Sequence, residues 1–289
     1  MATDGGSYGE YDPAIRSGLL AEAVRVVRSF SFAGAHVVVV GGLVPSLLVP
    51  QPEAGLEPHV GTNDLDLCLR MALVDGDVGS YERLETSLKV AGFVMMSGVS
   101  WRWKGGVSLP LTVEFFCPPK EGREIGRLYR PGGVVGGKLS AVVLAMGGLV
   151  DLDARDIEVE VNLPGDGGKT RQPLKVVGPA GYLAAKADAL RRRNKPKDAY
   201  DIVWLAECWP GGQAGLAPVI RESSIFNDPL FKDSLRTLRQ EFADIEAEGA
   251  KKYARFFNGS GRDMDQLARR AVGAIQQLLQ ELTAFMQVG

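Results

Sequence analysis

The sequence predicts an α/β (α+β) protein, in which a mixed β-sheet flanked by helices over residues 13–177 is followed by a helical domain over residues 178–289. Three observations predict this architecture. Short apolar runs alternate with amphipathic stretches in the first half. Glycine- and proline-rich turns separate them. From residue 178 onward, only helical periodicity remains.

The first half reads as helices and strands in alternation. Apolar residues at three- and four-residue steps predict a helix from residue 13 to residue 30, and the β-branched run 36–40 predicts a strand buried on both faces. Further strands are predicted at 64–70, 93–104, 108–117, 157–163 and 174–177, and further helices at 43–49, 80–91 and 139–150. Gly105 and Gly106 suit a hairpin turn between two of these strands.

The second half contains four predicted helices. They cover residues 179–193, 196–209, 229–248 and 264–286. Three of them begin at a proline, at residues 179, 196 and 229.

Composition limits the class of protein. Hydrophobic residues make up 45% and charged residues 24% of the 289 residues, as in ordinary folded proteins. The formal net charge of −2 means that any nucleic-acid contact would need a local basic patch. The widely spaced Cys68, Cys117 and Cys208 suggest neither a disulfide framework nor a zinc site, and we expect a cytoplasmic protein without a secretion signal or membrane span.

Asp64 and Asp66 stand out because one leucine separates them at the start of a predicted strand. Side chains alternate along a strand, so both carboxylates point to the same side. Their repulsion would be relieved by a hard cation such as Mg²⁺, which binds oxygen ligands. The alternative is a strand edge at which both aspartates are simply hydrated.

Glu114 is the only charge in the apolar run 109–116. A lone carboxylate is costly to bury without a partner, which makes Glu114 a candidate third acid. The alternative is an edge strand on which Glu114 faces water.

Gly41 and Gly42 end the buried strand at 36–40 and lead into a predicted helix. Bare backbone amides at such a corner can hold a phosphate. Ser46, one turn further on, either adds a hydroxyl to that site or has a structural role.

This order of motifs resembles the nucleotidyltransferase superfamily with the DNA-polymerase-β-like fold. The resemblance implies that residues 13–177 form the catalytic domain, with Gly41 and Gly42 at the nucleotide phosphates and Asp64, Asp66 and Glu114 as metal-binding catalytic acids. Two Mg²⁺ ions would then orient an NTP and activate an acceptor hydroxyl. The sequence departs from the family pattern at residues 50–59, which look like a loop inserted between the glycines and the aspartates.

Residues 179–202 resemble the segment that follows the catalytic domain in AbiEii-like nucleotidyltransferase toxins. The resemblance implies a catalytic and nucleotide-binding role for Lys186 and a nucleotide-binding role for Lys197, Asp198 and Asp201. The alternatives are a solvated lysine for Lys186 and a structural salt-bridge network for the aspartates. His36 and His59 fit no triad or metal spacing and are predicted in a strand and a loop.

These features lead us to expect a Mg²⁺-dependent enzyme that transfers an NMP from an NTP to an acceptor hydroxyl. The resemblance implies an RNA acceptor, such as a tRNA 3′ end, or a protein acceptor, and a cognate antitoxin as partner. Two alternatives remain open. One is a small-molecule nucleotidyltransferase of the aminoglycoside-modifying kind, and the other is a non-catalytic module that binds a nucleotide or an antitoxin.

Overall fold

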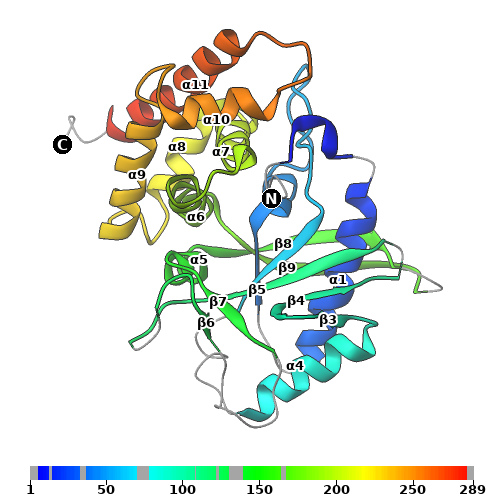
Figure 1. Cartoon of the computed structure of the whole chain (residues 1–289). Coiled ribbons are helices and arrows are strands. Elements are labelled where there is room, and N and C mark those ends of the chain that lie inside the picture. The colour runs from blue at the N-terminus through cyan, green and yellow to red at the C-terminus, as the bar shows by residue number, and fades with distance from the viewer. Residues whose placement is uncertain are drawn as a thin grey trace. The chain divides into compact units, whose positions relative to one another are not determined.

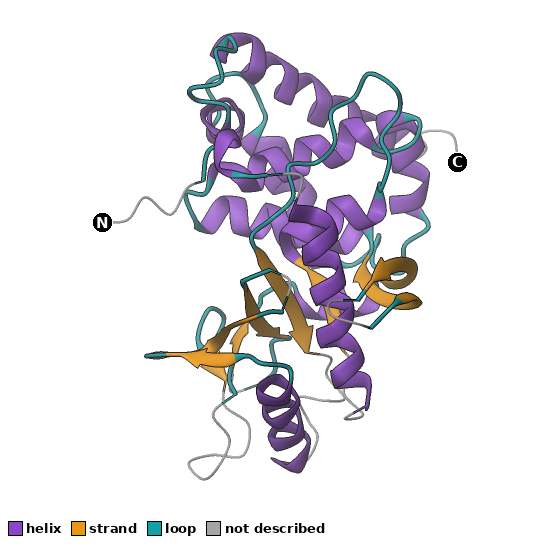
Figure 2. Ribbon diagram, turned by 90° about the vertical axis from the view of Figure 1, so that its right-hand side faces the viewer, coloured by secondary structure: helices purple, strands orange, loops and turns teal. Residues whose placement is uncertain are grey.

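The computed structural model describes residues 6–12, 15–32, 37–69, 78–107, 109–121, 124–129, 139–163 and 167–284. The chain forms two compact units. The sheet unit contains residues 14–44 and 62–177, and the helical unit contains residues 1–13, 45–61 and 178–289. Figure 2 shows the strands gathered in the first unit and helices dominating the second.

The sheet unit is built on one mixed sheet. Its helices are α1 (Arg16–Phe32), α4 (Val78–Val90) and α5 (Gly147–Leu152). Its strands are β1 (Val37–Val40), β2 (Asp64–Leu69), β3 (Val94–Met96), β4 (Val99–Gly105), β5 (Leu111–Cys117), β6 (Leu128–Tyr129), β7 (Ala141–Val143), β8 (Ala154–Asn162) and β9 (Lys169–Val177). The strand order is β3-β4-β5-β2-β1-β9-β8, and β7 pairs with both β5 and β6.

The central strands pair in both directions. Strand β1 is antiparallel to β2 and parallel to β9, while β2 is parallel to β5. All four residues of β1 are buried, which confirms the strand expected to be covered on both faces. Leu65 and Leu67 on β2 share a face of the sheet with Phe115 on β5. The Phe115 ring lies 5.9 Å from that of Phe30 on α1. Figure 1 shows β5 and α1 within this unit.

The helical unit contains α6 (Pro179–Arg192), α7 (Pro196–Cys208), α8 (Gly212–Arg221), α9 (Pro229–Glu241), α10 (Glu248–Phe256) and α11 (Met264–Ala284). The short 3₁₀ helix η1 (Tyr8–Glu10) also belongs to it. Aromatic rings join its parts, since Tyr200 on α7 stacks on Phe256 of α10 at 4.5 Å and Tyr8 contacts Phe257 at 5.0 Å.

Residues 45–61 differ from the sequence-based prediction of domains at 13–177 and 178–289. They belong with the C-terminal helices although they come early in the chain. The backbone N–H of Gly211 donates to Glu53, and the Trp204 indole donates to the carbonyl of Glu57. The stretch expected to be an inserted surface loop is a loop with mostly exposed residues, and it belongs to the helical unit.

Three predicted elements differ in detail, and one helix was not predicted. The strand expected at 93–104 is two strands, because Gly98 takes a φ of +74° and turns the chain. The helix expected at 139–150 is instead strand β7 followed by α5, since β7 pairs with β5. The helix expected at 229–248 ends at Glu241, where Gly249 of α10 packs against its carbonyl, and α8 was not expected. The predicted positions 13–14, 36, 70, 108 and 285–286 lie outside the described residues.

We expect the stability of the sheet to depend on burial at β5. Val113→Ala removes two methyl groups from a fully buried site and should lower the free energy of unfolding by about 2 kcal/mol. Val94→Ala, at a site that is 67% exposed on β3, is the matched control and should change it by less than about 0.5 kcal/mol. Urea unfolding followed by circular dichroism measures both, and equal losses would contradict the assigned register.

Candidate functional site

The sheet unit presents a row of acids on one face of its central strands. Asp64 and Asp66 are half-buried on β2, while the intervening Leu65 is fully buried on the opposite face. Parallel pairing with β5 sets Asp66 beside Glu114 and Asp64 beside Thr112. Since neighbouring strands lie about 4.8 Å apart, the structure brings the three predicted acids together on one face.

A glycine corner adjoins this row. Gly41 follows β1 directly, in the 3₁₀ turn η3 (Gly41–Leu43), and has a φ of +70°. A Cβ atom built at Gly41 would overlap the Oδ2 atom of Asp66. Only glycine combines this backbone conformation with such a close approach, so Asp66 lies directly against the corner.

The rest of the predicted phosphate turn is shorter than expected. Gly42 is buried in η3, and the helix that follows, α2 (Val44–Leu48), has only five residues. Ser46 is 2% exposed and belongs to the helical unit, whereas Gly41 and Gly42 belong to the sheet unit.

Arg102 is a site residue that the sequence reasoning missed. Its Nε atom lies 2.7 Å from Oε1 of Glu114, and its guanidinium lies 4.3 Å from the centroid of the Trp101 ring. Antiparallel pairing of β4 with β5 places Arg102 opposite Glu114. The predicted hairpin turn at Gly105 and Gly106 could have identified it, because pairing the two strands from this turn places Arg102 near Glu114.

Oxygen donors of this kind fit a hard cation such as Mg²⁺ at Asp64 and Asp66. Glu114 is already in an ion pair with Arg102, so it would have to share or exchange that partner to bind a metal. Within the described ranges, no group of three or more His, Cys, Asp or Glu side chains is arranged to hold a metal ion.

The helical unit contains the second predicted set, joined in a buried ionic network. The Nζ atom of Lys186 lies 2.8 Å from Oδ1 of Asp198 and 2.6 Å from Oδ2 of Asp201. Lys197 binds Oδ1 of Asp201 at 2.7 Å, one helical turn away. Arg193 forms a bidentate contact with Asp198, at 2.7 and 2.9 Å. The salt-bridge network that the sequence left open as an alternative is therefore present.

The pKa values of the two lysines in this network shift in opposite directions. Burial alone lowers the pKa of Lys186, but the carboxylates of Asp198 and Asp201 outweigh burial and raise it. For Lys197, burial dominates and lowers the pKa. Although burial opposes it, the two lysines hold the pKa of Asp201 well below its ordinary value, so both aspartates stay ionised.

His59 completes the network and was also missed. Its Nε2 atom lies 3.0 Å from Oδ1 of Asp201, and the side chains of both residues are fully buried. The backbone N–H of Gly61 donates to Nδ1 at 3.0 Å, so the proton is on Nε2 and is donated to Asp201. Burial lowers the pKa of His59 to about 4, which keeps the ring neutral. No local pattern links two residues 142 positions apart.

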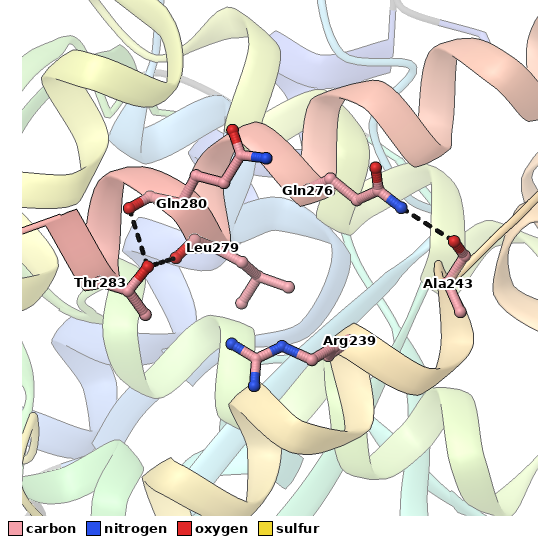
Figure 3. A pocket seen from close by; sticks show the side chains of 6 residues that line it. All are labelled: Arg239, Ala243, Gln276, Leu279, Gln280 and Thr283. Atoms are coloured by element: carbon pink, nitrogen blue, oxygen red, sulfur yellow. Dashed lines mark hydrogen bonds between the residues drawn. The ribbon is translucent and has the colours of Figure 1, made fainter.

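A separate pocket of about 320 Å³ lies between α9 and α11. It is lined by Arg239, Ala243, Gln276, Leu279, Gln280 and Thr283 (Figure 3). The amide of Gln276 donates to the carbonyl of Ala243, and the hydroxyl of Thr283 donates to two carbonyls of its own helix. None of the predicted site residues lines it.

None of the helices in the described part of the chain combines the length and apolar character needed to cross a membrane.

Comparison with known proteins gives one family. Residues 135–280, just over half of the chain, match the family described as the nucleotidyl transferase AbiEii toxin of the type IV toxin–antitoxin system. No curated protein matches. The matched residues include the buried network on α6 and α7 and exclude Gly41, Asp64, Asp66 and Glu114.

Two solved structures from Helicobacter pylori are similar at low identity. The crystal structure of JHP933 is 14% identical with a TM-score of 0.40, and the match covers 94% of this chain and 95% of that one. A structure described as a candidate nucleotidyltransferase is 13% identical with a TM-score of 0.39, and the match covers 93% of this chain and 97% of that one.

The glycine corner makes a direct prediction. Gly41→Ala forces a Cβ atom onto Asp66 and a left-handed backbone onto alanine, so it should cost about 1–3 kcal/mol of unfolding free energy. Gly148→Ala on α5, where a Cβ atom meets nothing within 4 Å, is the matched control and should be neutral or stabilising. Chemical denaturation of both variants measures the difference, and a neutral Gly41→Ala would show that Asp66 does not lie against this corner.

The buried His59 predicts a dependence of stability on pH. Because its pKa falls from 6.5 in the unfolded chain to about 4 in the folded one, the unfolded chain binds an extra proton between these values. The contribution of His59 to the free energy of unfolding is therefore fully present above about pH 6.5 and is lost as the pH falls. At pH 5 the free energy of unfolding should be about 2 kcal/mol lower than at neutral pH.

His59→Gln cannot titrate and serves as the control for this pH effect. Unfolding by urea at pH 8 and pH 5 should show the additional loss in the wild type only. Parallel losses in the two proteins would mean that the imidazole is not buried in its neutral form.

Proposed function

This chain belongs to the AbiEii family of nucleotidyltransferase toxins of type IV toxin–antitoxin systems, and we propose that it transfers an NMP from an NTP to an acceptor hydroxyl with Mg²⁺. The acceptor in this proposal is an RNA, such as a tRNA 3′ end, or a protein side chain. The toxin–antitoxin membership suggests a cognate antitoxin as a further partner. NTPs as substrate place the reaction in the cytoplasm.

The observation that carries the proposal is the acid row against the glycine corner. Asp66 approaches Gly41 so closely that no other residue fits there, and β5 sets Glu114 beside it. Carboxylates brought together in this way repel each other unless a cation lies between them. Asp64 and Asp66 are the residues that would hold Mg²⁺.

The chemistry requires a nucleophile, a leaving group and a place for one proton. The acceptor oxygen forms a bond to the α-phosphorus, the bond from that phosphorus to the bridging oxygen breaks, and pyrophosphate leaves. Mg²⁺ supplies charge stabilisation and lowers the pKa of the acceptor hydroxyl. Glu114 either receives the released proton or shares in metal binding, and Arg102 holds its carboxylate in place meanwhile.

In this proposal, basic side chains of the helical unit bind the triphosphate. Lys186, Lys197 and Arg193 carry three positive charges against the two carboxylates of Asp198 and Asp201, so the network has one positive charge in excess. The side chain of Arg193 is 54% exposed, so this positive charge is accessible to an anionic ligand such as a triphosphate. We also propose nucleotide contacts for the backbone amides of Gly41 and Gly42 and, separately, for the hydroxyl of Ser46.

A second candidate function is a non-catalytic nucleotide-binding module. The Arg102–Glu114 ion pair favours it, because it occupies the third acid that a two-metal site would use. Such a module binds NTP and forms no product. A small-molecule nucleotidyltransferase would instead label an aminoglycoside-like acceptor. Testing such acceptors beside RNA and protein therefore distinguishes it from the proposed enzyme.

Labelled nucleotides test the proposal directly. Incubation of the protein with Mg²⁺, each α-labelled NTP, total RNA and total protein should label one acceptor class, and chelation of Mg²⁺ should abolish labelling. Asp66→Asn and Asp64→Asn should each lower the rate by at least about 100-fold, since each removes charge from the proposed metal site.

The control for these variants is Asp156→Asn. Asp156 lies on β8 in an exposed ion pair with Lys175, away from the acid row, and its loss should leave the rate within about two-fold of wild type. Binding of NTP without any labelled product would favour the non-catalytic module. Product formation by Asp66→Asn at the wild-type rate would refute the assigned site.

A further inference from the structure

The carboxylate of Asp201 is shared among three donors. Lys197 and His59 both bind Oδ1, at 2.7 and 3.0 Å, and Lys186 binds Oδ2. Lys186 on α6 and Lys197 on α7 reach Asp201 with long, flexible side chains. His59 alone comes from outside these helices, in residues 45–61.

The His59 ring is held rigidly from its other sides. Gly61 donates to Nδ1, while the rings of Tyr200 and Trp204 lie 5.2 and 4.9 Å from the imidazole. The flanking backbone is also tied to α7, because Val60 donates to the hydroxyl of Tyr200. His59 therefore presents one N–H group in one direction, toward Asp201.

A neutral donor is suited to this position. It orients Oδ1 without adding a charge to a network that already has one positive charge in excess. A third cation on Asp201 would increase that excess, and an apolar side chain would leave Oδ1 of Asp201 to the longer, more flexible side chain of Lys197. The orientation of Asp201 in turn sets where the ammonium group of Lys186 lies, because Lys186 bridges Asp201 and Asp198.

We infer that His59 is a positioning residue for nucleotide binding, which holds Asp201 in the orientation that directs Lys186 toward the triphosphate. The inference rests on the proposed function, in which Lys186 contacts the nucleotide. It gives residues 57–61 a role in the site, although no motif marks them.

Three variants separate positioning from simple stability. His59→Leu keeps the volume and removes the donor, whereas His59→Gln carries an amide N–H that can reach Oδ1. Ser234→Ala, which removes another buried hydrogen bond of the same unit, to the carbonyl of Leu230, is the control. Steady-state kinetics with the NTP that wild type uses best, at saturating acceptor and Mg²⁺, provide KM and kcat.

His59→Leu should raise the KM for NTP by about 10-fold or more, as expected when a hydrogen bond to a charged group is lost. His59→Gln should restore KM to within about three-fold of wild type, and Ser234→Ala should leave it unchanged. If His59→Leu fails to fold by circular dichroism, His59→Asn, whose amide is too short to reach Asp201, replaces it.

Three results would overturn the inference. Equal KM values for the Leu, Gln and wild-type proteins would show that His59 does not position the site. A change confined to the Mg²⁺ dependence would show that its influence runs instead through Asp64, which lies three positions after Gly61 in the sequence. If the wild type neither binds nor converts any NTP in calorimetry, the proposed function itself fails, and that outcome is distinct from the other two.

Discussion

The carboxylate of Asp201 is the group on which the polar interior of the helical unit depends. It is fully buried and accepts contacts from two lysines and one neutral histidine. Removing a carboxylate from water costs several kcal/mol, and only its partners make the ionised form stable there. Loss of Asp201 would leave Lys186 dependent on Asp198 and would leave Lys197, whose pKa is already lowered by burial, without its carboxylate. Lys186, Asp198 and Asp201 therefore hold one another in their charged state, while His59 takes part in the network as a neutral donor.

The acids of the sheet unit are positioned in a different way from those of the helical unit. Asp64 and Asp66 are half-buried, and the backbone of β2 sets the face on which they lie. Gly41 allows the carboxylate of Asp66 to lie against the chain, and the register of β5 adds Glu114. The family match begins at residue 135, after the strands that hold Asp64, Asp66 and Glu114, and covers the helices that hold Lys186 and Asp201, so the acid row and the buried network rest on independent observations.

Patterns within short stretches of the sequence predicted the features that depend only on neighbouring residues, such as helices and the faces of strands. The shared face of Asp64 and Asp66 follows from alternation within one strand, and the helices α6 and α7 follow from periodicity and their first-turn prolines. Glu114 stood out as the only charge in an apolar run, yet its place beside Asp66 depends on strand pairing that no local window contains. Arg102 required the hairpin register. His59 had no signal at all, since its environment is created by helices more than a hundred residues away.

The chain passes between the two units at residues 13/14, 44/45, 61/62 and 177/178. Glu57 pairs with Arg262, 205 residues further on, and His59 pairs with Asp201, 142 residues further on. During synthesis, residues 45–61 emerge from the ribosome long before the helices that will enclose them. Contacts of such high sequence separation form slowly, because a long loop must close before they contribute. Co-translational folding of this protein can thus complete neither the helical unit nor its buried charges until nearly the whole chain has been made, and a fragment starting at residue 178 would lack the histidine that faces Asp201.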